Sequence, residues 1–360
     1  MKELYLLTSY KKIFGYIIYL IFLIVVSVTL LEVVLYFSLQ CPKCWSIVDN
    51  KFIAQRIVRA DRNIIQYMEE CAEYDQDLSY RLKSGSCGFS NIEFDTTINV
   101  NQEGYRLVSD NTAKDNESCT IAFLGDSFAM GWGVEDYDTY ASILTNKLQC
   151  KGYNMGVSSY GTPREVLRLN KSNIPTPDYI VLQYADNDLK ENKSFYDNLN
   201  SLSIMSEDKY NSVRDRYLIN QEYFFYKHSW VLFNAILFNF KEKYYNLSKN
   251  TNVSQINDVS QMNEVDYFYN ALSKLNPEFK EVRLIVFELN STNRNDDHFI
   301  NTFNEKYHKK LLKEFPNIIL LTVAKDLDIS NYFEFDDHIN ISGHKIIANK
   351  LEDALLEHVK

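Results

Sequence analysis

The chain has 360 residues, and 46% of them are hydrophobic, which is ample material for a buried core. This composition argues against a disordered or fibrous protein. The formal net charge of -10 argues against a protein that binds nucleic acid, because such a protein carries a basic stripe that collects phosphates. We therefore expect a folded protein with no nucleic-acid partner.

An uncharged run begins close to the N-terminus. Residues 13–31 (IFGYIIYLIFLIVVSVTLL) contain neither a charge nor a proline. At about 1.5 Å per residue this run nearly crosses a hydrocarbon core of ~30 Å, and residues 33–37 extend it if Glu32 lies near the interface. The sequence therefore predicts one transmembrane helix over 13–37, in preference to a buried core helix.

Two alternatives to an uncleaved anchor are a signal peptide and a lipoprotein. A signal peptide has a shorter apolar region that ends at small residues, whereas the first alanine here is Ala54. A lipoprotein site at Cys41 would need a small residue where Gln40 stands. Three lysines within residues 1–12 favour a cytoplasmic N-terminus. We expect a single-pass protein whose remaining chain, from residue 38 on, is extracytoplasmic, at a bacterial inner membrane and facing the periplasm.

Six cysteines lie in the first half of the exported part, and their even number suits an oxidising compartment. They are Cys41, Cys44, Cys71, Cys87, Cys119 and Cys150. Disulfides are the expectation, although spacing alone leaves their pairing open. The alternative is that CPKC at 41–44 forms half of a metal site, but no second Cys-x-x-Cys or His-x-x-x-His supplies the other ligands. The sequence therefore predicts no metal site.

Three kinds of segment follow the anchor. Residues 38–117 are polar and carry cysteines, which predicts a stalk and N-terminal extension with a helical stretch near 50–73. From residue 118 on, short apolar runs alternate with amphipathic segments, as in a parallel α/β sheet. A long interruption over 190–263 predicts either a helical pair that completes the core or a substrate-binding cap. Its apolar part, 229–240, is too short to span a membrane.

The α/β part, residues 118–360, contains five predicted strands and three predicted helices. The strands are expected over 120–124, 153–157, 179–184, 282–289 and 318–323. The helices are expected over 140–149, 303–315 and 342–358. In the last helix, apolar residues recur at helical spacing, so one face should pack on the sheet.

Polar segments follow four of the predicted strands. Gly125-Asp126-Ser127 comes after the first strand, GVSSYG (156–161) after the second and Asn187 after the third, and FDDHINISGH (335–344) follows the last. Ligands bind beyond the carboxyl ends of the strands of an open parallel sheet, so these segments should meet. Each segment alone is weak evidence for an active site, but together they supply the nucleophile, base, orienting acid and oxyanion donors that acyl transfer needs.

The residue types suggest a role for each position. Ser127, at a tight strand-to-helix turn, is the candidate nucleophile. His338 would accept its proton, and Asp336 would orient the imidazole and stabilise the imidazolium. The Ser127 backbone N–H, a backbone N–H of the second loop and the Asn187 amide would bind the oxyanion.

These four blocks resemble the SGNH/GDSL hydrolase superfamily from about residue 119 to the end of the chain. The sequence stretches YNMGVSSYGTPRE and DDHINISGH are similar to those of membrane-anchored bacterial members and of exported polysaccharide acetyl-transfer or deacetylation proteins. The resemblance implies a flavodoxin-like three-layer α/β/α fold, no cofactor and ester chemistry on an acyl group. The chain departs from the family where Ser159 stands in place of the oxyanion-hole glycine, which leaves Ser159 and Gly161 as alternative donors. The family's Asp-x-His spacing selects Asp336 over Asp337.

Other serines and histidines fit worse. Ser158 does not complete a Gly-x-Ser-x-Gly elbow, because Tyr160 stands where the second glycine belongs. His344 is expected in the first turn of the last helix. No acid or serine motif recommends His228, His298 or His308.

The sequence thus predicts a membrane-anchored serine esterase that removes an acyl group, acetyl above all, from an extracytoplasmic glycan or a lipid-linked substrate. One alternative keeps the same Ser, His and Asp but passes the acyl group to an exported polysaccharide, as an O-acetyltransferase. An alternative of another class is a catalytically silent glycan-binding or assembly protein that uses the fold as a scaffold.

Overall fold

The computed structural model describes residues 2–38, 41, 55, 58–60, 62–108, 119–249, 262–291 and 296–357. The chain divides into two compact units. The first unit consists of Met1–Arg62 and Asn220–Ile256, and the second of Asn63–Ile219 and Asn257–Lys360. The predicted sheet and all the candidate site residues belong to the second unit.

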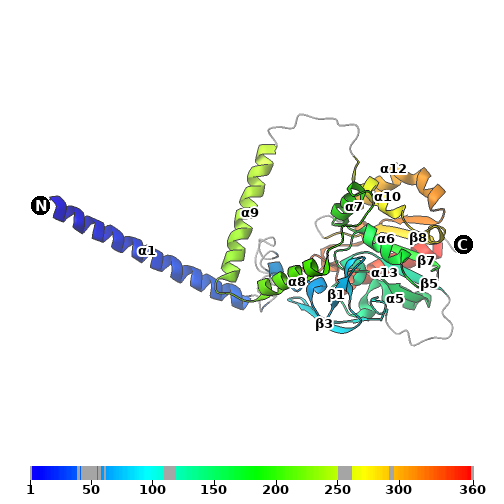
Figure 1. Cartoon of the computed structure of the whole chain (residues 1–360), viewed down its shortest axis with the longest axis horizontal. Coiled ribbons are helices and arrows are strands. Elements are labelled where there is room, and N and C mark those ends of the chain that lie inside the picture. The colour runs from blue at the N-terminus through cyan, green and yellow to red at the C-terminus, as the bar shows by residue number, and fades with distance from the viewer. Residues whose placement is uncertain are drawn as a thin grey trace. The chain divides into compact units, whose positions relative to one another are not determined.

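Five parallel strands form the centre of the second unit (Figure 1). In chain order they are β5 (Thr120–Leu124), β6 (Lys151–Asn154), β7 (Tyr179–Tyr184), β8 (Arg283–Glu288) and β9 (Ile318–Leu321). In space they are ordered β6-β5-β7-β8-β9, which is the 2-1-3-4-5 order of flavodoxin-like folds. The chain reverses its direction of winding between β5 and β7, so the carboxyl ends of these two strands mark the expected ligand crevice.

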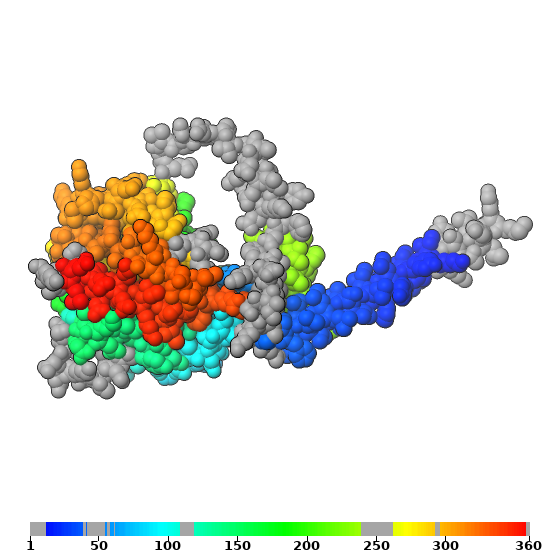
Figure 2. Space-filling model, turned by 180° about the vertical axis from the view of Figure 1, so that it is seen from behind, coloured from blue at the N-terminus to red at the C-terminus, as the bar shows by residue number. Residues whose placement is uncertain are grey.

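One face of the sheet is covered by α5 (Tyr140–Leu148) and α13 (Ile341–Glu357). Successive strand residues point to opposite faces, and Ile121 and Phe123 of β5 point to this one. Both side chains are fully buried. On the surface, α13 (red) lies beside α5 (green) in Figure 2.

The other face is covered by α6 (Thr162–Asn170), α10 (Glu264–Leu272) and α12 (His298–Glu314). Ala122 and Leu124, the alternate residues of β5, are buried among them. A sheet covered on both faces must be apolar on both faces, which explains why its strands read as continuous hydrophobic runs. The predicted three-layer α/β/α fold is therefore confirmed.

The second strand and the α12 helix differ from their predicted bounds. β6 ends at Asn154, because the Asn154 side chain donates to the Ala129 carbonyl and accepts from the Gly156 N–H. α12 begins at His298 rather than 303, since the Glu288 carboxylate at the end of β8 accepts from the Phe299 and Ile300 N–H groups in the first turn of this helix. Both boundaries depend on hydrogen bonds between a side chain and the backbone of another segment, which the local sequence does not reveal.

Residues 72–100 are folded, where a stalk was predicted. They form two antiparallel hairpins, the first of β1 (Ala72–Asp75) and β2 (Ser79–Leu82), the second of β3 (Gly85–Asn91) and β4 (Phe94–Val100). Their buried side chains join Trp132, which follows β5, in one cluster. The alternation of buried and exposed residues in these strands was too short to stand out in the sequence.

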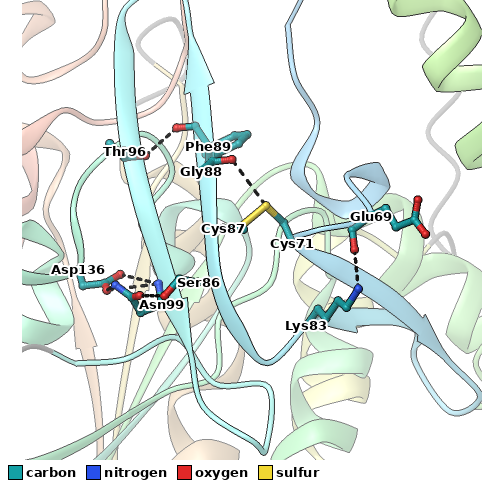
Figure 3. The surroundings of a disulfide bond; sticks show 10 residues. All are labelled: Glu69, Cys71, Lys83, Ser86, Cys87, Gly88, Phe89, Thr96, Asn99 and Asp136. Carbon is teal, nitrogen blue, oxygen red and sulfur yellow. Dashed lines mark hydrogen bonds between the residues drawn. A yellow bond between two sulfur atoms is a disulfide. The ribbon is translucent and has the colours of Figure 1, made fainter.

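Disulfides are found where the cysteines were expected to form them. Cys71 pairs with Cys87 and ties the chain before β1 to the second hairpin (Figure 3). Cys119 pairs with Cys150, so the two chain segments that enter β5 and β6 are joined. Cys41 is disulfide-bonded as well. Cys44 of the CPKC motif lies outside the described residues.

The insertion predicted over 190–263 is divided between the two units. In the second unit it contributes most of α7 (Asp188–Asp197) and all but the end of α8 (Glu207–Gln221), whose Tyr210 packs with the hairpins. In the first unit it contributes α9 (Lys227–Lys249), which contacts α1 (Lys2–Ser38). Within α1, Lys12–Ser38 has a mean hydropathy of 2.8 and is long and apolar enough to cross a membrane.

His344 lies in the first turn of α13, as predicted, and is fully buried. Its Nδ1 accepts from the Tyr140 N–H at 3.1 Å. Burial lowers the pKa of His344 from 6.5 to about 3, so below pH 6.5 the unfolded chain takes up a proton that the folded chain does not. This histidine therefore makes the protein less stable as the pH falls.

We expect the His344→Asn variant, which keeps an acceptor for the Tyr140 N–H, to lose this contribution. Between about pH 7.5 and about pH 5.5, the free energy of unfolding of the unmodified chain should fall by about 1.4 kcal/mol more than that of the variant. Urea unfolding of both proteins at the two pH values measures the difference. Equal pH dependence of the two would show that the pKa of His344 is the same in the folded and unfolded chains, which contradicts the lowered pKa.

Candidate active site

A tight turn joins β5 to the short helix α4 (Ser127–Met130). Gly125 has a φ of +146°, and a Cβ there would meet the Gln183 Oε1 at 2.6 Å and the Ala129 Cβ at 2.7 Å. Asp126 caps the helix by accepting from the Phe128 N–H at 2.9 Å. The Gly-Asp pair therefore turns the chain within two residues and sets Ser127 at the carboxyl end of the strand.

Ser127 is joined to His338 and Asp336 by two hydrogen bonds. The Ser127 hydroxyl lies 2.7 Å from Nε2 of His338, and Nδ1 of His338 lies 2.5 Å from Oδ1 of Asp336. In the tautomer that this network requires, the hydroxyl donates to Nε2 and Nδ1–H donates to the carboxylate. The three side chains are mostly buried, since Ser127, His338 and Asp336 are 6%, 8% and 5% exposed. This is the arrangement of a nucleophile, a base and an orienting acid.

The imidazole of His338 contacts two aromatic rings. The Trp132 ring stacks on it at 4.7 Å with an interplanar angle of 13°, and the Phe128 ring lies 4.8 Å away. The Trp132 Nε1–H donates to Oδ2 of Asp336 at 3.0 Å. Trp132 thus fixes the plane of the His338 ring and the position of Oδ2 of Asp336.

Glu93, at the tip of the β3–β4 hairpin, holds the loop that carries Asp336. Its carboxylate accepts from the backbone N–H groups of Glu334, Phe335 and Asp336 at 2.6 to 2.9 Å. Burial raises the pKa of Glu93, while these three bonds oppose the rise. Nothing local in the sequence marks Glu93, because its partners lie more than 240 residues away.

Arg106 supports the loop on the other side of Ser127. The guanidinium is fully buried and donates to Asp136 at 2.7 Å, to the Gly131 carbonyl at 2.5 Å and to the Val134 carbonyl at 2.6 Å. Gly131 ends α4 in the left-handed conformation, so this arginine binds the carbonyls that the end of the helix leaves open. Sequence reasoning missed Arg106, which stands in the QEGYRL segment ahead of the sheet.

Asp337 lies farther from the imidazole than Asp336 does. Its carboxylate lies 3.9 Å from Nδ1 of His338, and about a third of its side chain is exposed. Asp336, Asp337 and His338 have ligand atoms within 4.8 Å of one another, as a metal site would. Both imidazole nitrogens are already bonded to Ser127 and Asp336, so the residues fit a triad better than a cation site.

Two of the predicted oxyanion donors have N–H groups suited to the task. Ser127 is the first residue of α4, and the first N–H groups of a helix have no intrahelical acceptor. Asn187, at the end of β7, is exposed and donates one amide hydrogen to Oδ2 of Asp126 at 2.9 Å. An amide carries two N–H donors, so Asn187 retains a second one for a ligand.

Of the two second-loop alternatives, the geometry favours Ser159. The Gly161 N–H donates to Oε2 of Glu191 at 3.1 Å and is therefore occupied. Ser159 is exposed with a φ of +61°, and its carbonyl accepts from Arg164 at 2.7 Å. Arg164 in turn is paired with Glu191 at 2.5 Å, so one ion pair sets the shape of this loop.

A cleft of about 510 Å³ opens next to these donors. Ser159 and Asn187 line it, together with polar and aromatic side chains from the 3-10 helix Ile65–Tyr67, β2, α6, α7 and the segment before α8. These include Gln66, Tyr67, Ser79, Tyr80, Arg164, Lys190, Glu191, Ser194 and Ser203. The cleft is therefore rich in hydroxyl and amide groups that can hydrogen-bond a polar ligand.

Trp132→Phe tests the second hydrogen bond of Asp336. Phenylalanine keeps an aromatic ring against His338 but removes the N–H donor, and a hydrogen bond to a charged group contributes about 1.5 to 3 kcal/mol. We expect kcat/KM for an ester substrate to fall by roughly 10- to 100-fold, with little change in melting temperature. Steady-state kinetics and thermal unfolding of the same preparation measure both. Unchanged kcat/KM would show that the bond contributes nothing to the orientation of Asp336.

No family model matches the chain, and no curated protein matches it. Among solved structures, a putative lipolytic protein of the G-D-S-L family from Desulfitobacterium hafniense is 12% identical, with a TM-score of 0.34 over 65% of this chain and 98% of the other. A putative GDSL-like lipase from Parabacteroides merdae is 16% identical, with a TM-score of 0.36 over 66% and 96%. A family two carbohydrate esterase from Clostridium thermocellum is 12% identical, with a TM-score of 0.38 over 71% and 68%.

Proposed function

We propose that this protein is a membrane-anchored serine esterase of the SGNH/GDSL type. The observation that carries the proposal is the chain of hydrogen bonds from Ser127 through His338 to Asp336. Its position at the carboxyl ends of β5 and β7, where the sheet order reverses, is where an open α/β sheet binds ligands.

The geometry supports a two-step acyl transfer. Ser127 Oγ attacks the ester carbonyl as its proton passes to Nε2 of His338, and Asp336 stabilises the imidazolium. The carbonyl oxygen takes up negative charge, which the N–H groups of Ser127, Ser159 and Asn187 bind. The imidazolium then protonates the leaving alcohol. A water molecule, deprotonated by His338, attacks the acyl-serine. The bond to Ser127 Oγ then breaks, the carboxylic acid is released, and His338 returns the proton to Ser127 Oγ.

The chemistry of the cleft supports a glycan or a lipid-linked sugar as substrate, and acetyl is the acyl group that the sequence resemblance implies. Sugar hydroxyls need many donors and acceptors, and sugar rings pack on aromatic faces. The cleft offers serine hydroxyls and the rings of Tyr67 and Tyr80. The disulfides support an extracytoplasmic site, because such bonds persist in oxidising compartments.

The same residues would pass the acyl group to a sugar hydroxyl in place of water if the site excludes water. The low exposure of Ser127, 6%, is the observation that favours this second function. The two reactions differ only in the acceptor, so product analysis separates them.

The test is to incubate the full chain in detergent with an acetylated glycan, with and without an unacetylated acceptor glycan, and to follow acetate by NMR. Free acetate at the same rate in both mixtures supports the esterase. Acetyl that appears on the acceptor supports the transferase. If neither occurs while the fold is intact, the proposal fails, and the catalytically silent glycan-binding or assembly protein is the alternative that remains.

A further inference from the structure

Glu32 is the only charged residue within residues 13–37, and it is 1% exposed. A carboxylate within an apolar helix is costly unless it is paired and hydrogen-bonded. The structure supplies these partners from the first turn of α9. Oε2 of Glu32 accepts from the Ser229 N–H and the Ser229 hydroxyl, each at 2.7 Å. Oε1 accepts from the His228 N–H at 3.2 Å and lies 3.0 Å from Nδ1 of His228.

These contacts set the depth at which α9 begins. Glu32 lies six residues before Ser38, the last residue of the candidate span, which is about 9 Å along the helix axis. One turn further into the span, the Thr29 hydroxyl is 2.9 Å from the Tyr226 hydroxyl. If α1 crosses a membrane, the start of α9 therefore lies at the level of the lipid, not outside it.

Aromatic side chains around the start of α9 are exposed. Phe224, Phe225, Trp230 and Phe233 are 53%, 59%, 58% and 52% exposed. A cluster of this kind is unfavourable in water and marks an interaction surface. The helix α1, which α9 contacts, also exposes apolar side chains, and its Phe22 is 58% exposed. We therefore expect the exposed side chains of α1 and α9 to lie in the same environment. Tryptophan and phenylalanine are also common in helices that lie in a membrane interface.

We propose that the segment 223–238 is a second membrane-embedded element, whose aromatic side chains contact lipid, and that Glu32 is the buried acceptor that holds it against α1. The uncharged part of this segment, residues 229–238, is too short to span a bilayer but suits an interfacial or re-entrant helix. The inference rests on the membrane anchorage in the proposed function and is independent of its chemistry. The protein is then bound to the bilayer by α1 and α9 together.

The test uses single introduced cysteines in the full chain, reconstituted in phosphatidylcholine vesicles that contain phosphatidylglycerol. Phe233→Cys probes α9, Phe22→Cys is the control within α1, and Leu199→Cys, at a position 89% exposed between α7 and α8, is the control in water. Each variant is labelled with an environment-sensitive fluorophore through a membrane-permeant maleimide. The measured quantity is the quenching of that fluorophore by lipids with spin-labelled acyl chains.

We expect several-fold stronger quenching at positions 22 and 233 than at position 199. Quenching at 22 but not at 233 would overturn the inference and leave the membrane anchor intact; a blue-shifted but unquenched fluorophore at 233 would indicate a protein partner or a second copy in place of lipid. Absence of quenching at both positions would remove the anchor itself. None of these results depends on ester hydrolysis, so each is distinct from a failure of the proposed chemistry.

A second variant tests the role of Glu32. Glu32→Ala removes the acceptor for the first turn of α9 and should lower quenching at position 233 without lowering it at position 22. Glu32→Gln keeps an acceptor and should retain most of the quenching at 233. Equal quenching in all three backgrounds would show that α9 reaches the lipid without Glu32, and the assigned role of this residue would be wrong.

Discussion

Replacing Ser127 by alanine should lower kcat for p-nitrophenyl acetate by a factor on the order of 10⁴ to 10⁶. The substitution removes only the hydroxyl group, whose oxygen is hydrogen-bonded to Nε2 of His338. Without it there is no acyl-serine, and only the oxyanion donors and substrate binding remain to assist attack by water. Among the residues that the structure describes, the hydroxyl is bonded to His338 and to no backbone group, so the melting temperature should change by only a few degrees.

The matched control is Ser158→Ala. Ser158 is also buried and near the site, but the bond it makes to Tyr80 uses its backbone carbonyl, which alanine keeps. We expect turnover within about twofold of the unmodified chain, since the change is neutral for the triad. Equal loss of activity in both variants would mean that the loss comes from the fold and not from a missing nucleophile.

Replacing Arg106 by methionine should have the largest effect on stability. The guanidinium is fully buried, and its removal leaves Asp136 without its cation and the Gly131 and Val134 carbonyls without a donor. Breaking a buried ion pair by removing one partner costs about 3 to 5 kcal/mol of unfolding free energy. Because the same loop follows Ser127, esterase activity should fall as well. Chemical unfolding followed by circular dichroism measures the first effect.

Arg81→Met is the control for the loss of an arginine. Arg81 is paired with Glu73 at 2.8 Å, but both side chains are more than a third exposed, and a pair of this kind contributes at most about 1 kcal/mol. We expect this variant to unfold close to the unmodified chain. An Arg106→Met variant as stable as Arg81→Met would contradict the role given to the buried guanidinium.

The core of the second unit could be predicted from the sequence because its signals are local. β5 and β7 have the predicted bounds, since each is an apolar run bounded by polar residues. The three polar blocks Gly125-Asp126-Ser127, Asn187 and Asp336-x-His338 meet because parallel strands place their carboxyl ends at one edge. The Asp-x-His spacing also selects the carboxylate that lies nearer the imidazole, with Asp336 at 2.5 Å from Nδ1 of His338 and Asp337 at 3.9 Å.

The features of the structure that the sequence did not predict depend on contacts between residues that are remote in sequence. Glu93 and Trp132 contact Asp336 from more than 200 residues away, and no local pattern marks either. The choice between Ser159 and Gly161 depends on Glu191, which occupies the Gly161 N–H from the next helix along the chain. No acidic residue near His228 in the sequence indicated a partner for it, yet it is paired with Glu32, nearly 200 residues earlier. Each of these contacts exists only once the chain has folded.

The central claim is that Ser127 is a nucleophile activated by His338. The most direct measurement is to react the full chain with a fluorophosphonate probe and to map the adduct by mass spectrometry of proteolytic peptides. The account predicts a single adduct on Ser127, formed at a rate that falls when His338 is replaced by alanine. An adduct on another serine, or no adduct on a folded chain, would contradict it.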